Sequence, residues 1–279
     1  MFRIERAEKL NAVTARMDIS APLIAKKIEP GQFVIVRLGE KGEKIPLTVA
    51  GFDREKGILT IIFQAIGKST MELAELKAGE SILDVTGPLG EATPIEGHKK
   101  AVLVAGGLGC AIALPTAEKF FDLGIPVDIV LGFRSKDLVI LEDEFRRFGN
   151  SLTIMTDDGS YGAKGFVTDG LRALLESESG YDIAVTIGPP IMMKAVAEVT
   201  RPLAIETLAS LCPIMVDGTG MCGGCRVTVG GKTRFACVEG PDFDAHQVDF
   251  DELISRLKTY GDFERAAVEA HRCNLEARG

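Results

Sequence analysis

Apolar and polar residues alternate in short runs along the first third of the chain, and glycines separate the runs. Alternation with a period of two, broken by turn residues, is typical of short β-strands. One short helix, Met71 to Leu76, is expected within the series. The pattern predicts a small antiparallel β-barrel. Its expected strands are Phe2 to Lys9, Val13 to Ile19, Gln32 to Leu38, Pro46 to Phe52, Ile58 to Ile66 and Ser81 to Val85.

From Lys100 onward the pattern changes to an apolar strand followed by a segment of helical period, several times over. This alternation predicts an α/β domain whose parallel sheet is covered by helices on both faces. The expected strands are Ala101 to Ala105, Val127 to Leu131, Leu152 to Thr156 and Ile183 to Ile187, and the helices are Ala111 to Phe121, Glu142 to Phe148, Val167 to Leu175 and Ile191 to Val199.

Composition narrows the class of protein. The 279 residues carry a net charge of -8, which disfavours nucleic acid as a partner. The most apolar stretch, Ala101 to Pro115, is shorter than the ~20 residues of a spanning helix, and the first residues lack the pattern of a secretion signal. Three of the six cysteines lie close together, which favours a metal site in a reducing cytoplasm over a disulfide framework.

The segment from Asp217 to Cys225, with Cys222 within it and Cys237 twelve positions further on, carries the most specific signal. Plant-type ferredoxins hold a 2Fe-2S cluster with C-x4-C-x2-C and a distant fourth Cys, and here Asp217 takes the place of the first Cys. The residues after Cys225 read as a hairpin around Gly230-Gly231, which returns Cys237 to the side of Cys225. We therefore expect Asp217, Cys222, Cys225 and Cys237 to ligate the cluster.

A structural zinc site is the alternative for these cysteines. Its fourth ligand, beside Cys222, Cys225 and Cys237, is one of three residues, namely Cys212, His246 or Cys273. A zinc ribbon normally has two C-x2-C pairs, whereas this chain has one, so the iron-sulfur interpretation is favoured.

Gly106-Gly-Leu-Gly109 follows the first strand of the predicted α/β domain and precedes a helix, a place where a phosphate approaches helix amides. Tight packing explains such a turn equally well. The segments that begin at Gly132, Thr156 and Gly188 also follow strands, so they meet at the carboxyl edge, where open α/β sheets bind ligands.

In the barrel, Thr48 places a hydroxyl on a strand, and Gly67 to Thr70 begin the short helix with amides free to receive an anion. An ordinary helix cap is the alternative for Ser69 and Thr70. A P-loop is excluded because Ile62 stands where its first glycine is required.

The chain resembles the ferredoxin-NADP reductase superfamily, because it has a barrel, a nucleotide-binding sheet and a ferredoxin-like loop in this order. The chain is most similar to the small electron-transfer subunits of NADH-dependent reduced ferredoxin:NADP oxidoreductases, also called sulfide dehydrogenase subunits. The dihydroorotate dehydrogenase electron-transfer subunits are cousins that have Cys in place of Asp217. The most specific segments are Ile45 to Thr48, Thr156 to Gly162, Gly165 to Thr168 and Asp217 to Cys225.

The resemblance implies an oxidoreductase subunit that moves electrons between NAD(H) or NADP(H), FAD and a 2Fe-2S cluster. A flavin is the converter that two-electron and one-electron carriers need between them. The implied FAD residues are Pro46, Leu47, Thr48, Gly67, Ser69 and Thr70, and the implied dinucleotide residues are Gly107, Gly109, Arg134, Asp157, Gly188, Pro189 and Met192. Met192 is equally well explained as core filling.

Two departures affect this assignment. The Arg that the superfamily has before the flavin hydroxyl is either replaced by Lys44 or missing, and Cys212 lies close enough in sequence to compete with Asp217. The alternatives are a dihydroorotate dehydrogenase-type subunit, a zinc-stabilised nucleotide-binding regulator and a scaffold without cofactors. The resemblance favours NAD(H), although Arg134 is also suited to a 2'-phosphate.

A larger iron-sulfur flavoprotein is the expected partner, with ferredoxin reached through the complex, as in the electron-bifurcating enzymes that the chain resembles. The residues from Val248 to Ala277 have helical period, and their apolar stripe either folds back or docks on that partner. Deletion after Asp249 is expected to leave the cofactors in place. The expected domains are 1-97 for FAD, 98-202 for NAD(P), 203-247 for the cluster and 248-279 for the helical segment.

Overall fold

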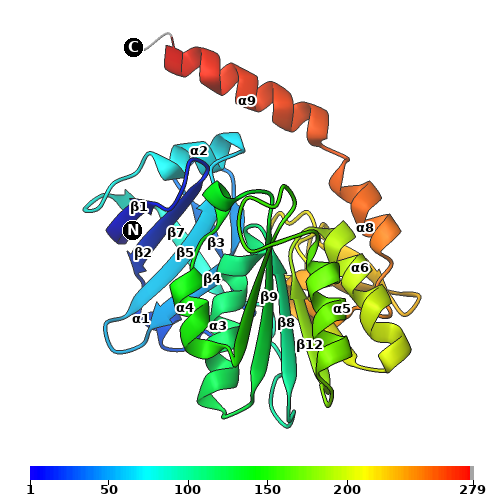
Figure 1. Ribbon diagram of the computed structural model, residues 1–279. Coiled ribbons are helices and arrows are strands. Elements are labelled where there is room, and N and C mark those ends of the chain that lie inside the picture. The colour runs from blue at the N-terminus through cyan, green and yellow to red at the C-terminus, as the bar shows by residue number, and fades with distance from the viewer. Residues whose placement is uncertain (277–279) are drawn as a thin grey trace.

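The computed structural model describes residues 1–276. An antiparallel sheet of seven strands, in the order β6-β1-β2-β5-β4-β3-β7, curls into a near-barrel at the N-terminal end of the chain (Figure 1). Two short helices accompany it, α1 (Pro22–Ala25) and α2 (Lys68–Ala74). The strands are β1 (Phe2–Lys9), β2 (Thr14–Ser20), β3 (Phe33–Arg37), β4 (Ile45–Asp53), β5 (Ile58–Gln64), β6 (Ser81–Ile82) and β7 (Asp84–Leu89).

Strand β3 belongs to two cores because its side chains point alternately to opposite faces. Val34 and Val36 are fully buried in the core of the barrel. Phe33 and Ile35 face the other way and join a core that contains Cys225 and Cys237. The barrel wall is therefore packed directly against the cysteine region.

The second sheet has the order β11-β10-β9-β8-β12-β13-β16 and is parallel except for its edge strand β16. Its strands are β8 (Ala101–Gly106), β9 (Val127–Phe133), β10 (Ser151–Thr156), β11 (Ala163–Lys164), β12 (Ile183–Ile187), β13 (Glu206–Ser210) and β16 (Asp242–Asp244). The helices around it are α3 (Gly109–Asp122), α4 (Glu142–Phe148), α5 (Val167–Ser177) and α6 (Pro190–Thr200).

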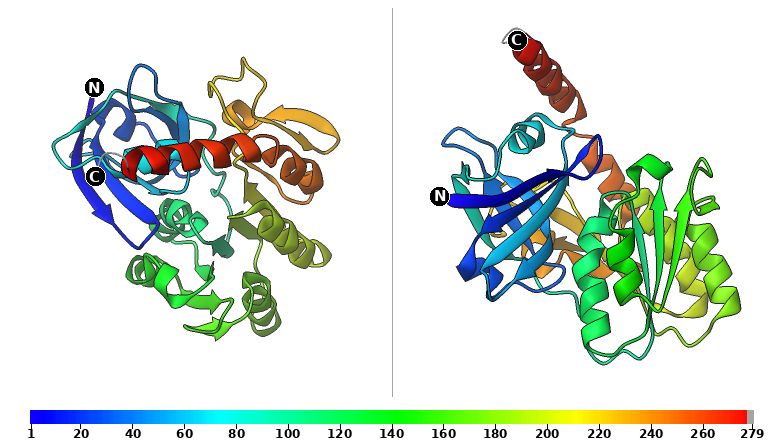
Figure 2. Two further views of the ribbon diagram at one scale, coloured as in Figure 1. Left: turned by 90° about the horizontal axis from the view of Figure 1, so that it is seen from above. Right: turned by 60° about the vertical axis from the view of Figure 1, so that its left-hand side comes forward.

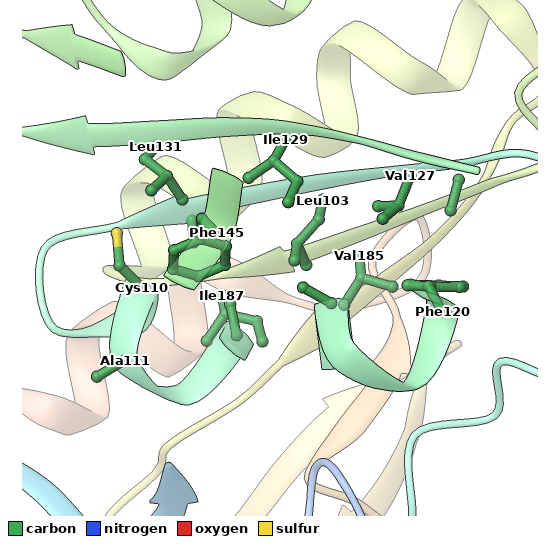
Figure 3. Close-up of a cluster of buried hydrophobic side chains, with 14 of the residues drawn as sticks. Leu103, Cys110, Ala111, Phe120, Val127, Ile129, Leu131, Phe145, Val185 and Ile187 are labelled. Carbon is green, nitrogen blue, oxygen red and sulfur yellow. The ribbon is translucent and has the colours of Figure 1, made fainter. Parts of the chain in front are cut away.

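Helices α3 and α4 cover one face of this sheet, and α5 and α6 cover the other (Figure 1). On the first face, Leu103, Ile129 and Val185 meet Phe120 and Phe145 (Figure 3). Alternate residues of the same strands pack against α5 and α6 on the opposite face. Burial on both faces explains why these strands are continuous apolar runs.

The C-terminal part contains the hairpin of β14 (Arg226–Val229) and β15 (Lys232–Phe235), followed by α7 (Ala236–Glu239). Helix α8 (Phe250–Leu257) buries Phe250 and Leu253 in the core that holds the cysteines. Helix α9 (Gly261–Glu276) instead leaves this region and crosses above α2 of the barrel (Figure 2). Its Phe263 is 75% exposed.

The predicted fold class is confirmed, with differences of detail. Helix α2 begins at Lys68, three residues before the expected start, because Thr70 bonds back to the Gly67 backbone and caps the first turn. Strands β11, β13 and β16 and helix α1 were not predicted. No helix among the described residues is long and apolar enough to cross a membrane. Residues 277–279, at the end of the expected C-terminal segment, lie outside the described residues.

Candidate functional site

The hairpin of β14 and β15 brings two cysteines together, as the sequence predicts. Arg226 pairs with Phe235 across the hairpin, and the turn residues Gly230 and Gly231 both have positive φ. The Sγ atoms of Cys225 and Cys237 lie 3.1 Å apart, and both residues are buried. Burial raises the pKa of Cys237 to about 12, so this thiol stays neutral until a metal displaces its proton.

The glycine-rich loop before the hairpin points backbone N–H groups at sulfur atoms. Gly220 N–H lies 3.1 Å from the Sγ of Cys237, and Gly224 N–H lies 3.4 Å from the Sγ of Cys222. Gly218, Gly220 and Gly223 have positive φ, which side chains rarely adopt. Inward amides stabilise the negative charge of a metal-sulfur centre, so this loop fits an iron-sulfur cluster.

Asp217 lies next to Cys222 within the same loop. Its carboxylate accepts the N–H groups of Thr219 at 2.8 Å and Cys222 at 3.1 Å. Hydrogen bonds from the Thr219 hydroxyl and amide hold its pKa below the usual value. The four predicted ligands therefore form two pairs, Asp217 with Cys222 and Cys225 with Cys237. Among the described residues, no three His, Cys, Asp or Glu side chains lie close enough together to hold a metal ion.

The zinc alternative receives no support from its other residues. The ring of His246 bonds to the hydroxyl of Thr200 at 3.0 Å. Cys273 lies in the last turns of α9, beyond His271, which contacts Glu72 of the barrel at 3.7 Å. Cys212 is exposed and precedes the loop.

The glycine-rich turn lies at the point where the order of the second sheet reverses. The chain adds strands on one side of β8 up to β11 and then returns to place β12 on its other side, and ligands bind at such switch points. Gly107 has φ +57° and no neighbour within 4 Å of a Cβ built on it, so its backbone is open to a ligand. A Cβ on Gly109 would lie 2.2 Å from the carbonyl oxygen of Ile187, so Gly109 serves close packing.

Met192 fills the space above the ends of β8 and β12. A Cβ on Gly106 would lie 2.4 Å from its Sδ, and one on Gly188 would lie 2.7 Å from its Cε. Its packing against two cores supports the interpretation as core filling. Arg134 and Asp157 follow β9 and β10 at the same edge, and both are exposed.

In the barrel, Pro46, Leu47 and Thr48 are half-buried on β4 and lie opposite Ile35, Val34 and Phe33 of β3. Thr70 accepts the N–H of Gly67 at 3.0 Å, so the cap interpretation holds for this residue. The hydroxyl of Ser69 donates to the carboxylate of Glu43. An anion at the start of α2 would have to displace that carboxylate.

Contacts between the barrel and the cysteine region were missed by sequence reasoning. The N–H of Glu91 donates to the carbonyl of Gly240 at 2.6 Å, and the hydroxyl of Thr93 bonds to the carboxyl of Asp242. Burial raises the pKa of Asp242. These pairs could not be predicted, because the two partners are far apart in the sequence. Each residue on its own has the pattern of an ordinary turn or strand end.

Comparisons with known proteins agree with this geometry. Residues 213–249 match the iron-sulfur cluster binding domain of dihydroorotate dehydrogenase B. A protein of Thermotoga maritima described as a homologue of the electron transfer subunit of dihydroorotate dehydrogenase B (NAD(+)) is 47% identical, over 90% of this chain and 88% of that protein. The corresponding subunit of Fusobacterium nucleatum is 34% identical, over 89% of this chain and 97% of its own length.

A solved structure of NADH-dependent reduced ferredoxin-NADP oxidoreductase, described in the context of flavin-based electron bifurcation, contains a chain with 43% identity and a TM-score of 0.91. The match covers 97% of each chain. Phthalate dioxygenase reductase shares the fold at 17% identity, with a TM-score of 0.61 over 82% of this chain and 85% of that one. The chain therefore belongs to the family of dihydroorotate dehydrogenase B electron-transfer subunits and their homologues.

Proposed function

We propose that this chain is the electron-transfer subunit of a heteromeric, NADH-dependent ferredoxin:NADP oxidoreductase of the electron-bifurcating kind. The observation that carries the proposal is the likeness over 97% of both chains to a chain of that enzyme. The Asp217 loop supports it, because its amides and thiols suit an iron-sulfur cluster. A dihydroorotate dehydrogenase-type subunit is the second candidate, favoured by the match of residues 213–249.

We infer that FAD lies along Pro46, Leu47 and Thr48, with its pyrophosphate near Gly67, Ser69 and Thr70. When bound, the flavin accepts a hydride and releases electrons singly, which links the nicotinamide to the cluster. The half-burial of these β4 residues supports this placement, since each of them keeps some exposed surface that a flavin could cover. Binding of the phosphates there would require Glu43 to give up its bond to Ser69.

The dinucleotide is placed at the switch point of the second sheet, across Gly107, Gly109, Arg134 and Asp157. Gly188, Pro189 and Met192 line its far side, where Met192 presents an apolar surface. The open backbone at Gly107 supports this placement, as does the amino end of the 14-residue helix α3 directly beneath it. We infer that Arg134, which is exposed at the end of β9, meets the ribose or its phosphate.

We assign Asp217, Cys222, Cys225 and Cys237 as the cluster ligands. Cys225 and Cys237 are in contact, so ligation requires Asp217 and Cys222 to turn toward them. The loop can do this without breaking the hairpin, because Cys222 is exposed and precedes the strands. The functional units are then 1-97 for FAD, 98-202 for the dinucleotide, 203-247 for the cluster and 248-279 for partner contact.

A larger iron-sulfur flavoprotein is the proposed partner, and α9 is the proposed docking helix. The apolar residues Phe263, Ala266, Ala267 and Ala270 of α9 are exposed, whereas Phe250 and Leu253 of α8 are buried. The match to the Fusobacterium subunit leaves about a tenth of this chain uncovered, and the match to the ferredoxin-NADP oxidoreductase chain covers 97%. The iron-sulfur domain match ends at residue 249, before α8.

A cytoplasmic location is inferred from the free thiols of all six cysteines.

An anaerobic titration of the purified chain with NADH tests the proposal. We expect flavin absorption bands and a broad iron-sulfur absorption, both bleached by NADH, and an EPR signal from the reduced cluster. A colourless protein that contains zinc would refute the proposal. Electron transfer to dihydroorotate dehydrogenase, but not to the ferredoxin:NADP partner, would establish the second candidate.

A further inference from the structure

The cluster loop touches the barrel wall at Gly218, the residue after Asp217. Gly218 is buried and has φ +79°. A Cβ built on it would lie 2.4 Å from the Cδ1 of Ile35 and 3.1 Å from the Cδ1 of Leu89. The loop backbone therefore lies directly on β3 and β7, with no room for a side chain between them.

Ile35 connects this contact to the proposed flavin strand. It is 4% exposed and pairs with Pro46 of β4 in the antiparallel register. Paired residues of neighbouring strands lie side by side on the same face. Pro46, Ile35 and Gly218 thus form a continuous line of contacts from the flavin strand to the cluster loop.

Two further contacts hold the other end of the cluster region to the barrel. A Cβ on Gly90 would lie 2.7 Å from the carbonyl oxygen of Gly240, and Glu91 N–H donates to the same oxygen. Thr93 bonds to Asp242 just beyond. The segment after Cys237 is therefore fixed to the barrel, and the Gly218 contact ties the loop that carries Asp217 and Cys222 to the same wall.

We propose that Ile35 and Gly218 are positioning residues that set the spacing between the flavin and the cluster. The inference rests on the proposed function. In the step concerned, the reduced flavin loses one electron and the oxidised cluster gains it, and NADH supplies the electrons that reduce the flavin. The rate of such a step falls steeply with distance, so a small displacement of the loop slows it.

Gly218→Ala tests the proposal, with Gly231→Ala as the matched control. Gly231 has φ +72° and nothing within 4 Å of its Cβ position, so the control introduces the same backbone strain without a steric clash. We expect Gly218→Ala to slow cluster reduction by about tenfold in stopped-flow mixing with NADH and to alter the EPR line shape. Flavin reduction by NADH is expected to stay at the native rate in both variants.

A second exchange tests the identity of the contact. Ile35→Val removes the Cδ1 atom that the new methyl would strike, so the double variant with Gly218→Ala is expected to recover fast cluster reduction. Equal rates for Gly218→Ala and Gly231→Ala would overturn the proposal. If Gly218→Ala contains no iron, the double variant decides: iron that fails to return overturns the proposal, and iron that returns supports it. Native protein without flavin or cluster would contradict the proposed function instead.

Discussion

Removal of helix α9 alone, by ending the chain at Tyr260, is predicted to abolish association with the larger flavoprotein while both cofactors stay bound. Helix α9 begins at Gly261, and its contacts with the barrel include the pair His271 and Glu72 at 3.7 Å. Because Phe263 is 75% exposed, its removal uncovers little of the fold. We expect the free energy of unfolding to change by less than about 1 kcal/mol.

Ending the chain at Asp249 is a different perturbation. The sequence alone predicts that the cofactors survive it, whereas the packing of α8 leads us to expect that the cluster is lost. Phe250 and Leu253 are 5% and 2% exposed and pack in the core with Cys225 and Cys237. Burial of each side chain contributes about 1.5–3 kcal/mol, so losing both costs about 3–6 kcal/mol. That is a large share of the ~5–15 kcal/mol that stabilises a typical domain.

Three measurements on the two truncated chains test this reasoning. They are co-purification with the larger iron-sulfur flavoprotein, flavin and iron content, and thermal unfolding. The chain ending at Tyr260 should keep native cofactor content and lose the partner. The chain ending at Asp249 should also lose iron and unfold at a lower temperature. Native association of the Tyr260 chain would refute docking through α9, and native iron content of the Asp249 chain would refute the estimate for α8.

Three further predictions concern the cofactors and the sheet. Asp217→Cys should keep the cluster and change its reduction potential and EPR signal, since thiolate and carboxylate donate differently; cluster loss in Cys212→Ser together with an intact cluster in Asp217→Ala would contradict the ligand assignment. Replacing Ser69 and Thr70 with Glu should expel FAD by repulsion, measured as the flavin-to-protein ratio, and an unchanged ratio would move the pyrophosphate elsewhere. Tyr181→Phe removes a 2.7 Å hydrogen bond to buried Asp128 and should cost about 1.5–3 kcal/mol in urea unfolding. Burial raises the pKa of Asp128, but bonds from Ser151, Tyr181 and Asn150 outweigh it and leave the pKa below its usual value. This stabilisation is therefore present above the unfolded pKa near 4 and is lost as the pH falls through the folded pKa, so a variant that loses as much at pH 3 as at pH 7 would contradict the assignment.

Most of the architecture could be predicted because local patterns determine it. Strands β1 and β12 and helix α4 have the predicted bounds, since the alternation in β1, the apolar run of β12 and the helical period of α4 are clear in the sequence. Strand β16 could not be found, because Asp242–Asp244 is three residues long and pairs only through the distant β13. The division of the C-terminal stripe into a buried α8 and an exposed α9 depends on tertiary packing, which periodicity does not report.

The candidate site was predictable where chemistry and spacing coincide. The alternating runs on either side of the Gly-Gly turn were sufficient to predict that Cys225 lies beside Cys237. The contact between Gly218 and Ile35 was not predictable, because in the sequence Ile35 is an ordinary apolar strand residue. Glu43 beside Ser69 was equally invisible, since 26 residues separate them.

The core that contains Cys225 and Cys237 also draws side chains from β3 of the barrel and from β13 of the second sheet. Segments that share one core open together rather than singly, so their amides should exchange with solvent as a single cooperative unit. Loss of the metal centre should then speed up amide hydrogen exchange in β3 and β13, although these strands are far from the cysteines in the sequence. By the same reasoning, the cluster-free chain should be the form most exposed to proteolysis.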